Sequence, residues 1–332
     1  MNDVTLVLVE TDSQGATETS VESLTFARDL ARGTGSGEVH AVLVGSLDPA
    51  VRATVMSQLG DQGVAVVHHA QHDELASYSA AAWATSVAAA AAATTATVML
   101  AAGTPRGSEI MAHVATRLDT TMAAQVVAIA DADPLVVSRQ VMGGSVLELM
   151  QLTGTPAVLT VAGHAVEPAP AAQASVPEVR EFEPELLEGD LVGRVVKVEA
   201  VEADDTEALT GARVVVGAGR GAGSANGFDD LLELTDLLGG ALGVSRVVTS
   251  LGWRPHHEQV GQTGSRISPD LYIACGISGA IQHWAGCSSA KAILAINTDA
   301  DAPMVTKAHY AVVGDLHEIV PAINEELRRR AS

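Results

Sequence analysis

The chain has 332 residues, which predicts about two domains, and 47% of them are hydrophobic, which is enough for a sizeable core. Its 19 Lys and Arg against 40 Asp and Glu give a formal net charge of −21, which argues against binding to nucleic acid or insertion at an anionic membrane, because both contacts need basic side chains. The two cysteines cannot form a disulfide framework and the first residues lack the basic stretch of a signal peptide, so we expect a cytoplasmic protein.

Short apolar strands alternate with helical patterns in the first part of the chain. Residues 75–105 carry no charge, but they are rich in Ala, Thr and Ser and end in Gly103-Thr104-Pro105, so they predict a helix and a buried strand rather than a membrane span. Apolar strands separated by helices are typical of a parallel sheet covered on both faces. The strands are expected at Val4–Val9, Val39–Gly45, Val64–His68 and Val98–Ala102, with helices at Val21–Arg32 and Pro49–Leu59 and in the Ala-rich stretch.

The pattern changes after Arg117, where four strand-like segments follow with little room for helices between them. We expect these strands to form an antiparallel addition to the first domain; they are Ala124–Ala130, Leu135–Met142, Leu147–Leu152 and Ala157–Val161. The next segment, Gly163–Asp190, contains four prolines and a strong excess of acidic residues. Both features disfavour packing, so this segment is interpreted as an extended linker that ends the first domain, residues 1–190.

A second alternation of strands and helices fills residues 191–332, which predicts a second α/β domain with a parallel sheet. Its expected strands are Val192–Val201, Val214–Val216, Arg246–Thr249, Leu271–Cys275, Ala292–Asn297 and Tyr310–Val313. Its expected helices are Asp229–Leu238, Ile277–Ala285 and Leu316–Arg329, and a long loop covers residues 250–268.

A glycine-rich turn, residues 217–223, lies between a strand and a helix and contains Arg220. Backbone amides at such a turn attract phosphate, and the arginine favours this interpretation over that of a simple tight turn. A Rossmann NAD site would need an acidic residue about 20 positions further on for the ribose. Glu233 and Asp236 are candidates, although both fit the solvent-facing side of a helix.

Two further segments combine glycine with polar side chains. Residues 259–264 bunch amides and a hydroxyl among small residues, which suits a planar ring, although a solvated loop would show the same composition. Residues 276–283 again lead from a strand into a helix through glycine, and Ser278 stands where a second phosphate would bind. A lone helical histidine such as His283 is more often a packed or surface residue than a ligand.

Metal and nucleophile patterns are weak. His68, His69 and His72 lack a carboxylate-rich partner motif, and Cys275 and Cys287 do not have the spacing of zinc ligands. The sequence contains no nucleophile elbow and no Walker A lysine. Several nucleotide-binding turns without a nucleophile, base or metal indicate a cofactor carrier with no catalytic residues of its own.

The residues after position 205 match a known pattern. The run Ser268–His283, together with Val260–Gly264, Ala295-Ile296-Asn297 and Val313-Gly314-Asp315-Leu316, strongly resembles the FAD domain of the electron-transfer flavoprotein α subunit. The resemblance covers about residues 205–330, and the N-terminal half fits that family's first domain, an α/β domain like those of adenine nucleotide hydrolases. It implies a Rossmann-like FAD-binding domain at the C-terminus.

The resemblance also assigns residues to FAD. Arg220 would contact the phosphates, and Ser245 and Arg246 would meet the flavin, with His283 toward its C2 carbonyl. Asn297 and Asp315 would hold the ADP half. The remaining residues assigned to the cofactor are Gln259, Gln262, Thr263, Gly264, Gly276, Ser278, Gly279 and Gln282.

A role as redox carrier follows from the resemblance. It implies a heterodimer with a β subunit that carries AMP, electrons accepted from flavin dehydrogenases of the acyl-CoA dehydrogenase type in fatty acid β-oxidation, and delivery to a membrane quinone oxidoreductase. A nitrogen-fixation-linked or electron-bifurcating member is the alternative within the family; in bifurcating relatives the β subunit holds a second FAD in place of AMP. An NAD-dependent dehydrogenase and a nucleotide-sensing or structural module are the alternatives outside it.

Overall fold

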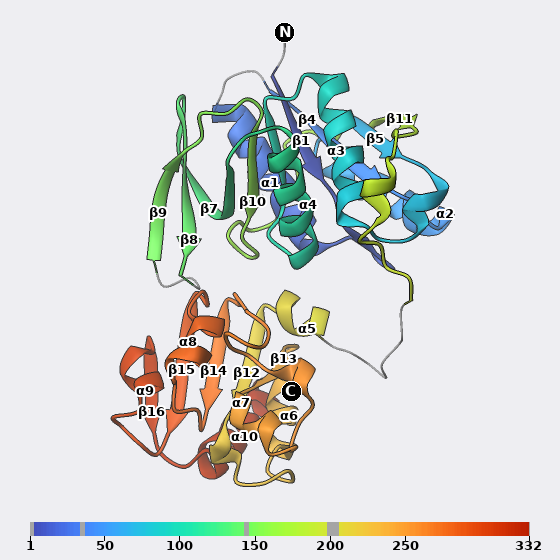
Figure 1. Cartoon of the computed structure of the whole chain (residues 1–332). Coiled ribbons are helices and arrows are strands. Elements are labelled where there is room, and N and C mark those ends of the chain that lie inside the picture. Colours follow the sequence, from blue (N-terminus) through green and yellow to red (C-terminus); the bar gives the residue numbers. More distant parts are fainter. Residues whose placement is uncertain (1–2, 34–36, 143–145, 198–205, 332) are drawn as a thin grey trace. The chain divides into compact units, whose positions relative to one another are not determined.

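The computed structural model describes residues 3–33, 37–142, 146–197 and 206–331. Its contacts divide the chain into two compact units, which we call the N-terminal unit (Met1–Gln140 and Leu147–Glu199) and the C-terminal unit (mainly Ala200–Ser332). Figure 1 follows the chain through both. No helix among the described residues is long and apolar enough to cross a membrane.

The N-terminal unit is built on a nine-stranded sheet in the order β11-β5-β4-β1-β6-β10-β7-β8-β9. Parallel pairing joins all the strands from β11 to β7, and β8 runs antiparallel to β7. The strands are β1 (Val4–Leu8), β4 (Glu38–Val44), β5 (Val66–Ala70), β6 (Val98–Ala102), β7 (Met122–Ala132), β8 (Leu135–Val141), β9 (Val146–Gln151), β10 (Ala157–Val161) and β11 (Glu178–Phe182). A short ribbon of β2 (Thr11–Asp12) and β3 (Gly15–Ala16) lies beside it.

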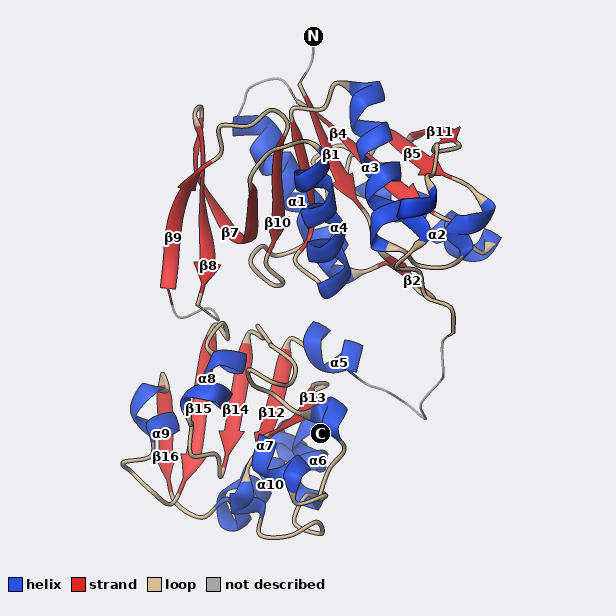
Figure 2. Cartoon of the chain, in the orientation of Figure 1, coloured by secondary structure: helices blue, strands red, loops and turns tan. Residues whose placement is uncertain are grey.

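Helices cover both faces of this sheet, as expected for parallel strands (Figure 2). One apolar core includes residues of α1 (Glu18–Gly33) and α2 (Pro49–Asp61), and the other includes residues of α3 (Ala80–Thr94) and α4 (Pro105–Arg117). The Ala-rich, charge-free stretch is therefore α3, a helix packed against α4, followed by the fully buried strand β6.

The prediction that the four strands after Arg117 are an antiparallel addition is wrong for two of them. β10 lies between β6 and β7 and runs parallel to both, so β7 also belongs to the parallel part of the sheet. All five residues of β10 are buried, which is typical of a central parallel strand rather than of a half-exposed antiparallel one. After β7 the chain forms β8 and β9 at one edge of the sheet and then returns to its interior as β10.

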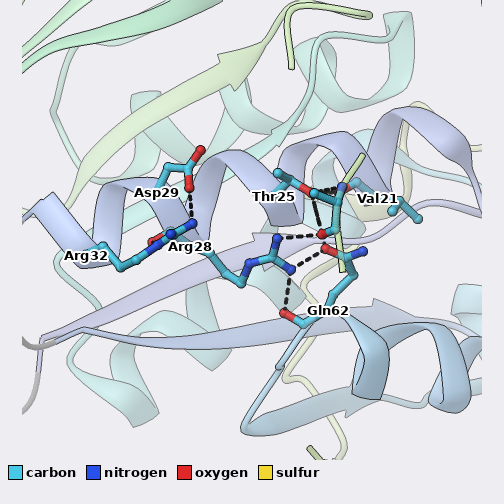
Figure 3. Close-up of polar contacts among 7 residues, drawn as sticks. Val21, Thr25, Arg28, Asp29, Arg32 and Gln62 are labelled. Atoms are coloured by element: carbon cyan, nitrogen blue, oxygen red, sulfur yellow. Dashed lines mark hydrogen bonds and ion pairs between the residues drawn. The ribbon is translucent and has the colours of Figure 1, made fainter. Parts of the chain in front are cut away.

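The interpretation of Gly163–Asp190 as a free linker is also wrong, because this segment packs on the N-terminal unit. Arg28 on α1 donates to the backbone carbonyl of Ala169 and to the carbonyl and side chain of Gln62, and Thr25 donates to Gln62 as well (Figure 3). Further along, β11 extends the sheet beside β5, and the buried Asp190 pairs with Arg117 at 2.5 Å. The segment is rich in proline, but its backbone carbonyls and acidic side chains accept hydrogen bonds from arginines of the N-terminal unit.

The C-terminal unit contains a parallel five-stranded sheet in the order β13-β12-β14-β15-β16. Its strands are β12 (Val214–Ala218), β13 (Ala241–Val244), β14 (Leu271–Cys275), β15 (Ala292–Asn297) and β16 (Tyr310–Val313). The order reverses between β12 and β14, and ligands of open α/β sheets bind at such a point, beyond the carboxyl ends of the strands. This confirms the α/β class and the parallel sheet of the second domain.

Two helical layers cover this second sheet. One core includes residues of α6 (Asp229–Leu237), α7 (Arg246–Ser250) and α10 (Leu316–Ala331). The other includes residues of α5 (Thr206–Gly211), α8 (Ile281–Cys287) and α9 (Pro303–Lys307). Both layers are visible around the sheet in Figure 2.

Two of the predicted strands of this unit are wrong. Arg246–Thr249 is helical and forms most of α7, while the strand before it, β13, is Ala241–Val244. The β-branched residues Val247, Val248 and Thr249 suggested a strand, but Gly239 already ends the preceding helix at a φ of +60°, so the strand starts earlier. Of the expected strand Val192–Val201, residues 198–201 lie outside the described residues, and residues 192–197 form only an isolated bridge from Arg194 to Ser79.

Candidate functional site

The residues assigned to FAD converge on the carboxyl edge of the C-terminal sheet. Each of its five strands ends in one or two of them, so residues almost a hundred positions apart meet at one edge. In strand order across the sheet, they are Ser245 and Arg246 after β13, Arg220 after β12, Gly276 and Ser278 after β14, Asn297 at the end of β15, and Asp315 after β16.

Two glycine turns interlock at the point where the strand order reverses. The Gly219 amide donates to the Cys275 carbonyl at 2.9 Å, and the Gly221 amide donates to the Gly276 carbonyl at 3.1 Å. A Cβ on Gly219 would lie 2.1 Å from the Gly276 oxygen, and Gly276 itself has a φ of +62°. Glycine is therefore required here for close approach of the two backbones.

The run of free amides lies in the second turn and not, as the sequence suggested, in the first; of residues 219–223, only the Arg220 amide donates to no acceptor among the described residues. The amides of Gly219, Gly221, Ala222 and Gly223 all donate to backbone carbonyls. In contrast, the backbone amides of residues 277–280 donate to no acceptor among the described residues. A run of unused amides of this kind is an anion-binding concavity, and the exposed Ser278 hydroxyl lies within it. Phosphate binding is thus best supported at the turn after β14.

A second cluster of assigned side chains surrounds Thr263. Arg246 Nη1 and Gln259 Nε2 each donate to the Thr263 hydroxyl at 3.1 Å. Gln259 is buried, and its side-chain oxygen accepts a hydrogen bond from Thr249 at 2.8 Å, which fixes the orientation of the amide. Arg246 and Thr263 are exposed, so this cluster presents a guanidinium, an amide and a hydroxyl together. The sequence did not indicate Thr249, because it was predicted to lie in a strand, whereas it lies in α7 beside Gln259.

The loop that carries Gln259, Gln262, Thr263 and Gly264 is held between β13 and α8. The Val260 amide donates to the Val244 carbonyl at 2.9 Å, and the Gln262 amide donates to the Gln282 carbonyl at 2.7 Å. These bonds bring the exposed side chains of Gln262 and Gln282 to neighbouring positions on two elements. Gly279, also assigned to the cofactor, is buried against the backbone of Met304 and shapes the turn.

Two buried polar side chains at this edge have an atom without a hydrogen-bond partner. Ser245 is 8% exposed and its hydroxyl has no partner among the described residues, and the Nδ1 atom of His283 is in the same situation. Burial lowers the pKa of His283 to about 4, and the Val260 backbone opposes this shift only in part. The His283 ring is therefore neutral near pH 7. In this environment it can donate a hydrogen bond, but it does not carry a positive charge.

Asn297 and Asp315 both have structural tasks. Asn297 donates to the Ile277 carbonyl at 2.9 Å and so supports the turn with the free amides. The Asp315 carboxylate accepts the His317 amide at 2.9 Å at the start of α10, and it remains exposed. Contact with the adenosine half of FAD is compatible with both roles.

The charges at the edge favour an anionic ligand. Arg220 and Arg246 are exposed and form no ion pair with a described carboxylate, whereas Arg213 and Arg254 in the same unit are paired. For NAD, the acidic candidate Glu233 pairs instead with Arg328 on α10 at 3.2 Å, and Asp236 lies exposed at the C-terminal end of α6. Neither residue follows a strand of the sheet, so no ribose-binding acid is found among the described residues in the position that the NAD alternative needs.

Other clusters of titratable residues lie elsewhere. His68 Nε2 lies 3.1 Å from His40 Nδ1, while the rings of His69 and His72 bond to the backbone of Gly45 and Glu74. The three histidines of the sequence cluster therefore do not converge on a common ion. Burial raises the pKa of the Cys275 and Cys287 thiols to about 12, so both remain protonated and serve as small core residues.

Comparisons with known proteins agree with this geometry. The family model for the electron transfer flavoprotein domain matches residues 5–187, and the model for the electron transfer flavoprotein FAD-binding domain matches residues 208–288. Asn297 and Asp315 lie beyond the second match. The amides of residues 277–280 and the Ser245 hydroxyl are the groups of this edge that have no hydrogen-bond partner among the described residues.

Curated relatives match over the full length. The electron transfer flavoprotein α subunit of Mycobacterium leprae is 36% identical over 325 residues, covering 98% of each chain. The corresponding protein of Thermoanaerobacterium thermosaccharolyticum is 33% identical, covering 93% of each chain, and the mitochondrial α subunit of Arabidopsis thaliana is 32% identical, covering 97% of this chain and 89% of its own. The chain therefore belongs to the electron transfer flavoprotein α-subunit family.

Proposed function

We propose that this chain is the α subunit of a heterodimeric electron-transfer flavoprotein and binds one FAD at the carboxyl edge of its C-terminal sheet. Membership of the family implies a flavin and a β-subunit partner. The observation that carries the proposal is the convergence of unused hydrogen-bonding groups on one edge: free amides in the turn after β14, the orphaned Ser245 hydroxyl, and the Arg246–Thr263 pair.

The residues of this edge would bind, orient and tune the cofactor. Ser278, the amides around it and Arg220 would hold the phosphates, and Asn297 and Asp315 would hold the ADP half. When bound, FAD supplies reversible electron transfer, which side chains alone cannot supply. Arg246 would stabilise negative charge on the ring that it faces, because a nearby cation favours the charged form.

Thr263 and Gln259 would fix the position of the Arg246 guanidinium, and with Gln262, Gly264 and Gln282 they would line the flavin ring. None of these groups is arranged to break a bond in a substrate. The proposed protein is therefore a carrier without substrate chemistry of its own.

Further expectations concern its partners. We propose that electrons come from flavin dehydrogenases of the acyl-CoA dehydrogenase type and leave to a quinone oxidoreductase, and that the β subunit binds AMP. Within the family, the alternative is a nitrogen-fixation-linked or electron-bifurcating member, and a bifurcating member would have a second FAD on the β subunit in place of AMP. The two alternatives differ in the number of flavins bound per heterodimer, one or two.

The test is the flavin content and reactivity of the heterodimer purified after coexpression with the neighbouring β subunit. We expect a yellow protein with about one FAD per heterodimer, reduced by an acyl-CoA dehydrogenase with its substrate and reoxidised by a quinone oxidoreductase. Two flavins per heterodimer would support the bifurcating alternative. A colourless heterodimer that binds NADH would overturn the proposal.

Within the site, Arg246→Ala should lower the midpoint potential of the bound flavin, because reduction places negative charge on a ring that has lost its cation. Arg266→Ala is a matched control, since Arg266 is another exposed arginine of the C-terminal unit, in the loop that follows α7. A potential that is the same in both variants would remove Arg246 from the flavin site.

A further inference from the structure

Tyr272 is a buried tyrosine in the middle of the C-terminal sheet. Its side chain is fully buried on β14, and its hydroxyl oxygen lies 2.8 Å from His283 Nε2. No other partner of this hydroxyl is found among the described residues. Gly217 on β12 makes room for it, because a Cβ at that position would lie 2.2 Å from the tyrosine oxygen. A buried hydroxyl in such a tight environment needs its one hydrogen bond.

The His283 ring lies between this hydroxyl and the loop that carries Gln259 and Thr263. Nε2 faces Tyr272, whereas Nδ1 has no hydrogen-bond partner among the described residues, and the Val260 backbone partly offsets the lowering of the pKa of the ring. A neutral imidazole has one N–H and one acceptor nitrogen, and the partner of one nitrogen decides which tautomer forms. Tyr272 can donate its proton only to Nε2, because no other acceptor for it is found among the described residues.

We propose that Tyr272 is a positioning residue for His283: its hydroxyl donates to Nε2 and thereby fixes the neutral ring as the tautomer that carries the proton on Nδ1. The sheet interior thus determines which nitrogen of the His283 ring carries the proton. The two protonation states agree with this arrangement, since burial raises the pKa of Tyr272 and lowers that of His283, so the pair shares a hydrogen bond between neutral groups.

The consequence for the cofactor rests on the proposed FAD site. A fixed Nδ1–H donor stabilises negative charge nearby without placing a full positive charge in the core. The opposite tautomer would turn a lone pair to the same side and would repel that charge.

The experiment is nitrogen NMR of the full-length heterodimer labelled on histidine, with His283→Gln to assign the resonances. In the wild-type protein we expect a protonated Nδ1 and an unprotonated Nε2, both in the FAD-loaded protein and after removal of FAD. A protonated Nε2 would overturn the proposal, and this measurement needs no variant that might fail to fold. Because the tautomer is also determined without FAD, failure of the proposed flavin function is distinguishable from failure of this inference.

The same NMR measurement on the Tyr272→Phe variant is the second test. We expect the His283 resonances to shift to a mixture of tautomers or to the Nε2–H form, and the midpoint potential of the bound flavin to fall. Tyr310→Phe is the matched control, because Tyr310 is exposed on β16 and its hydroxyl has no role in the pair. An unchanged His283 tautomer in Tyr272→Phe would show that the tyrosine only fills space, which would also overturn the proposal.

Discussion

The two units share a covered parallel sheet but treat its carboxyl edge in opposite ways. In the N-terminal unit, the strand order reverses between β1 and β6, and the side chains that follow these strands, Glu10 and Thr104, are hydrogen-bonded to each other. Further along the same edge, His69 bonds the Gly45 carbonyl at 2.7 Å and Gln125 donates to the Gly103 carbonyl at 2.8 Å. These side chains are therefore hydrogen-bonded to one another or to the backbone of the edge.

In the C-terminal unit, the corresponding edge is left incomplete. The turn after β14 has amides that donate to no described acceptor, and Ser245 is buried without a partner for its hydroxyl. A buried polar group without a partner costs about 1–3 kcal/mol. We therefore interpret the same architecture as a scaffold in the N-terminal unit and, in the C-terminal unit, as the proposed cofactor site. The difference lies in whether polar side chains at the edge have hydrogen-bond partners within the unit. Substitutions in the N-terminal unit should therefore change stability, and substitutions at the edge of the C-terminal sheet should change FAD binding.

The largest expected effect is on the stability of the N-terminal unit. Glu22 and His164 are both buried, with 2.9 Å between the Glu22 carboxylate and His164 Nδ1, and the same carboxylate accepts the His164 amide at 2.7 Å. Glu22→Ala should lower the free energy of unfolding by about 3–5 kcal/mol, because it removes one member of a buried pair, the carboxylate that accepts the His164 amide and faces the His164 ring. Urea unfolding measures this effect, and FAD affinity should be unchanged.

Glu18→Ala is the matched control for this prediction. Glu18 lies one helical turn from Glu22, and its carboxylate is within 4.8 Å of the Glu22 and His164 side chains, but Glu18 is exposed. We expect it to change the free energy of unfolding by less than about 0.5 kcal/mol. A similar loss in both variants would mean that the buried pair is not what stabilises this unit.

The interlocked glycine turns should respond in both stability and cofactor binding. In Gly276→Ala, the new Cβ would lie 2.6 Å from Gly221 Cα at a φ of +62°, so we expect a loss of about 2–4 kcal/mol of stability from strain and overpacking together with loss of FAD. Gly239→Ala has a similar φ of +60° but no atom within 4 Å, and it should cost only about 1 kcal/mol. Equal losses of stability in the two variants would show that backbone strain at positive φ, and not the close approach of the two turns, determines the effect.

The pH dependence of the C-terminal unit should reflect His283. Its pKa of about 4 in the folded protein lies below the ordinary 6.5, so the unfolded chain takes up a proton first as the pH falls. Stability that is present above pH 6.5 is therefore lost between pH 6.5 and about 4, by up to about 3 kcal/mol. His283→Gln should flatten this part of the curve, whereas His113→Gln, at an exposed position of α4, should leave it unchanged.

The smallest effect on stability is expected for Ser245→Ala. Because the hydroxyl has no partner, its removal should leave the free energy of unfolding of the FAD-free protein within about 0.5 kcal/mol or raise it slightly. FAD affinity should fall about five-fold, which corresponds to one hydrogen bond of about 1 kcal/mol. Ser250→Ala, at an exposed position of the same short helix, should change neither quantity, and an unaltered FAD affinity in Ser245→Ala would remove this residue from the site.

The sequence was most informative where the chain has a strict local pattern. The strands Val98–Ala102, Leu271–Cys275, Ala292–Asn297 and Tyr310–Val313 are confirmed to the residue, because short apolar runs between turns fix their ends locally. The family could also be identified from the long run Ser268–His283. Arg246–Thr249 failed because three β-branched residues favour a strand, whereas the position of the preceding turn placed them in a helix.

Other features depended on distant partners. The acidic segment Gly163–Asp190 looked like a linker because its binding groups, such as Arg28 and Arg117, lie far away in the sequence. The antiparallel prediction for β10 failed because pairing partners are chosen by the whole sheet and not by neighbours in the chain.

By itself, the sequence determined the α/β class, the family and the set of residues assigned to the carboxyl edge of the C-terminal sheet, since these depend on local periodicity and on contiguous motifs. Only the tertiary structure decided that the run of free amides lies after β14 rather than in the first glycine turn, and that His283 is neutral and bonded to Tyr272. These properties depend on which groups become buried together and on which hydrogen bonds remain unmade, and neither can be known until segments distant in the sequence are packed against one another.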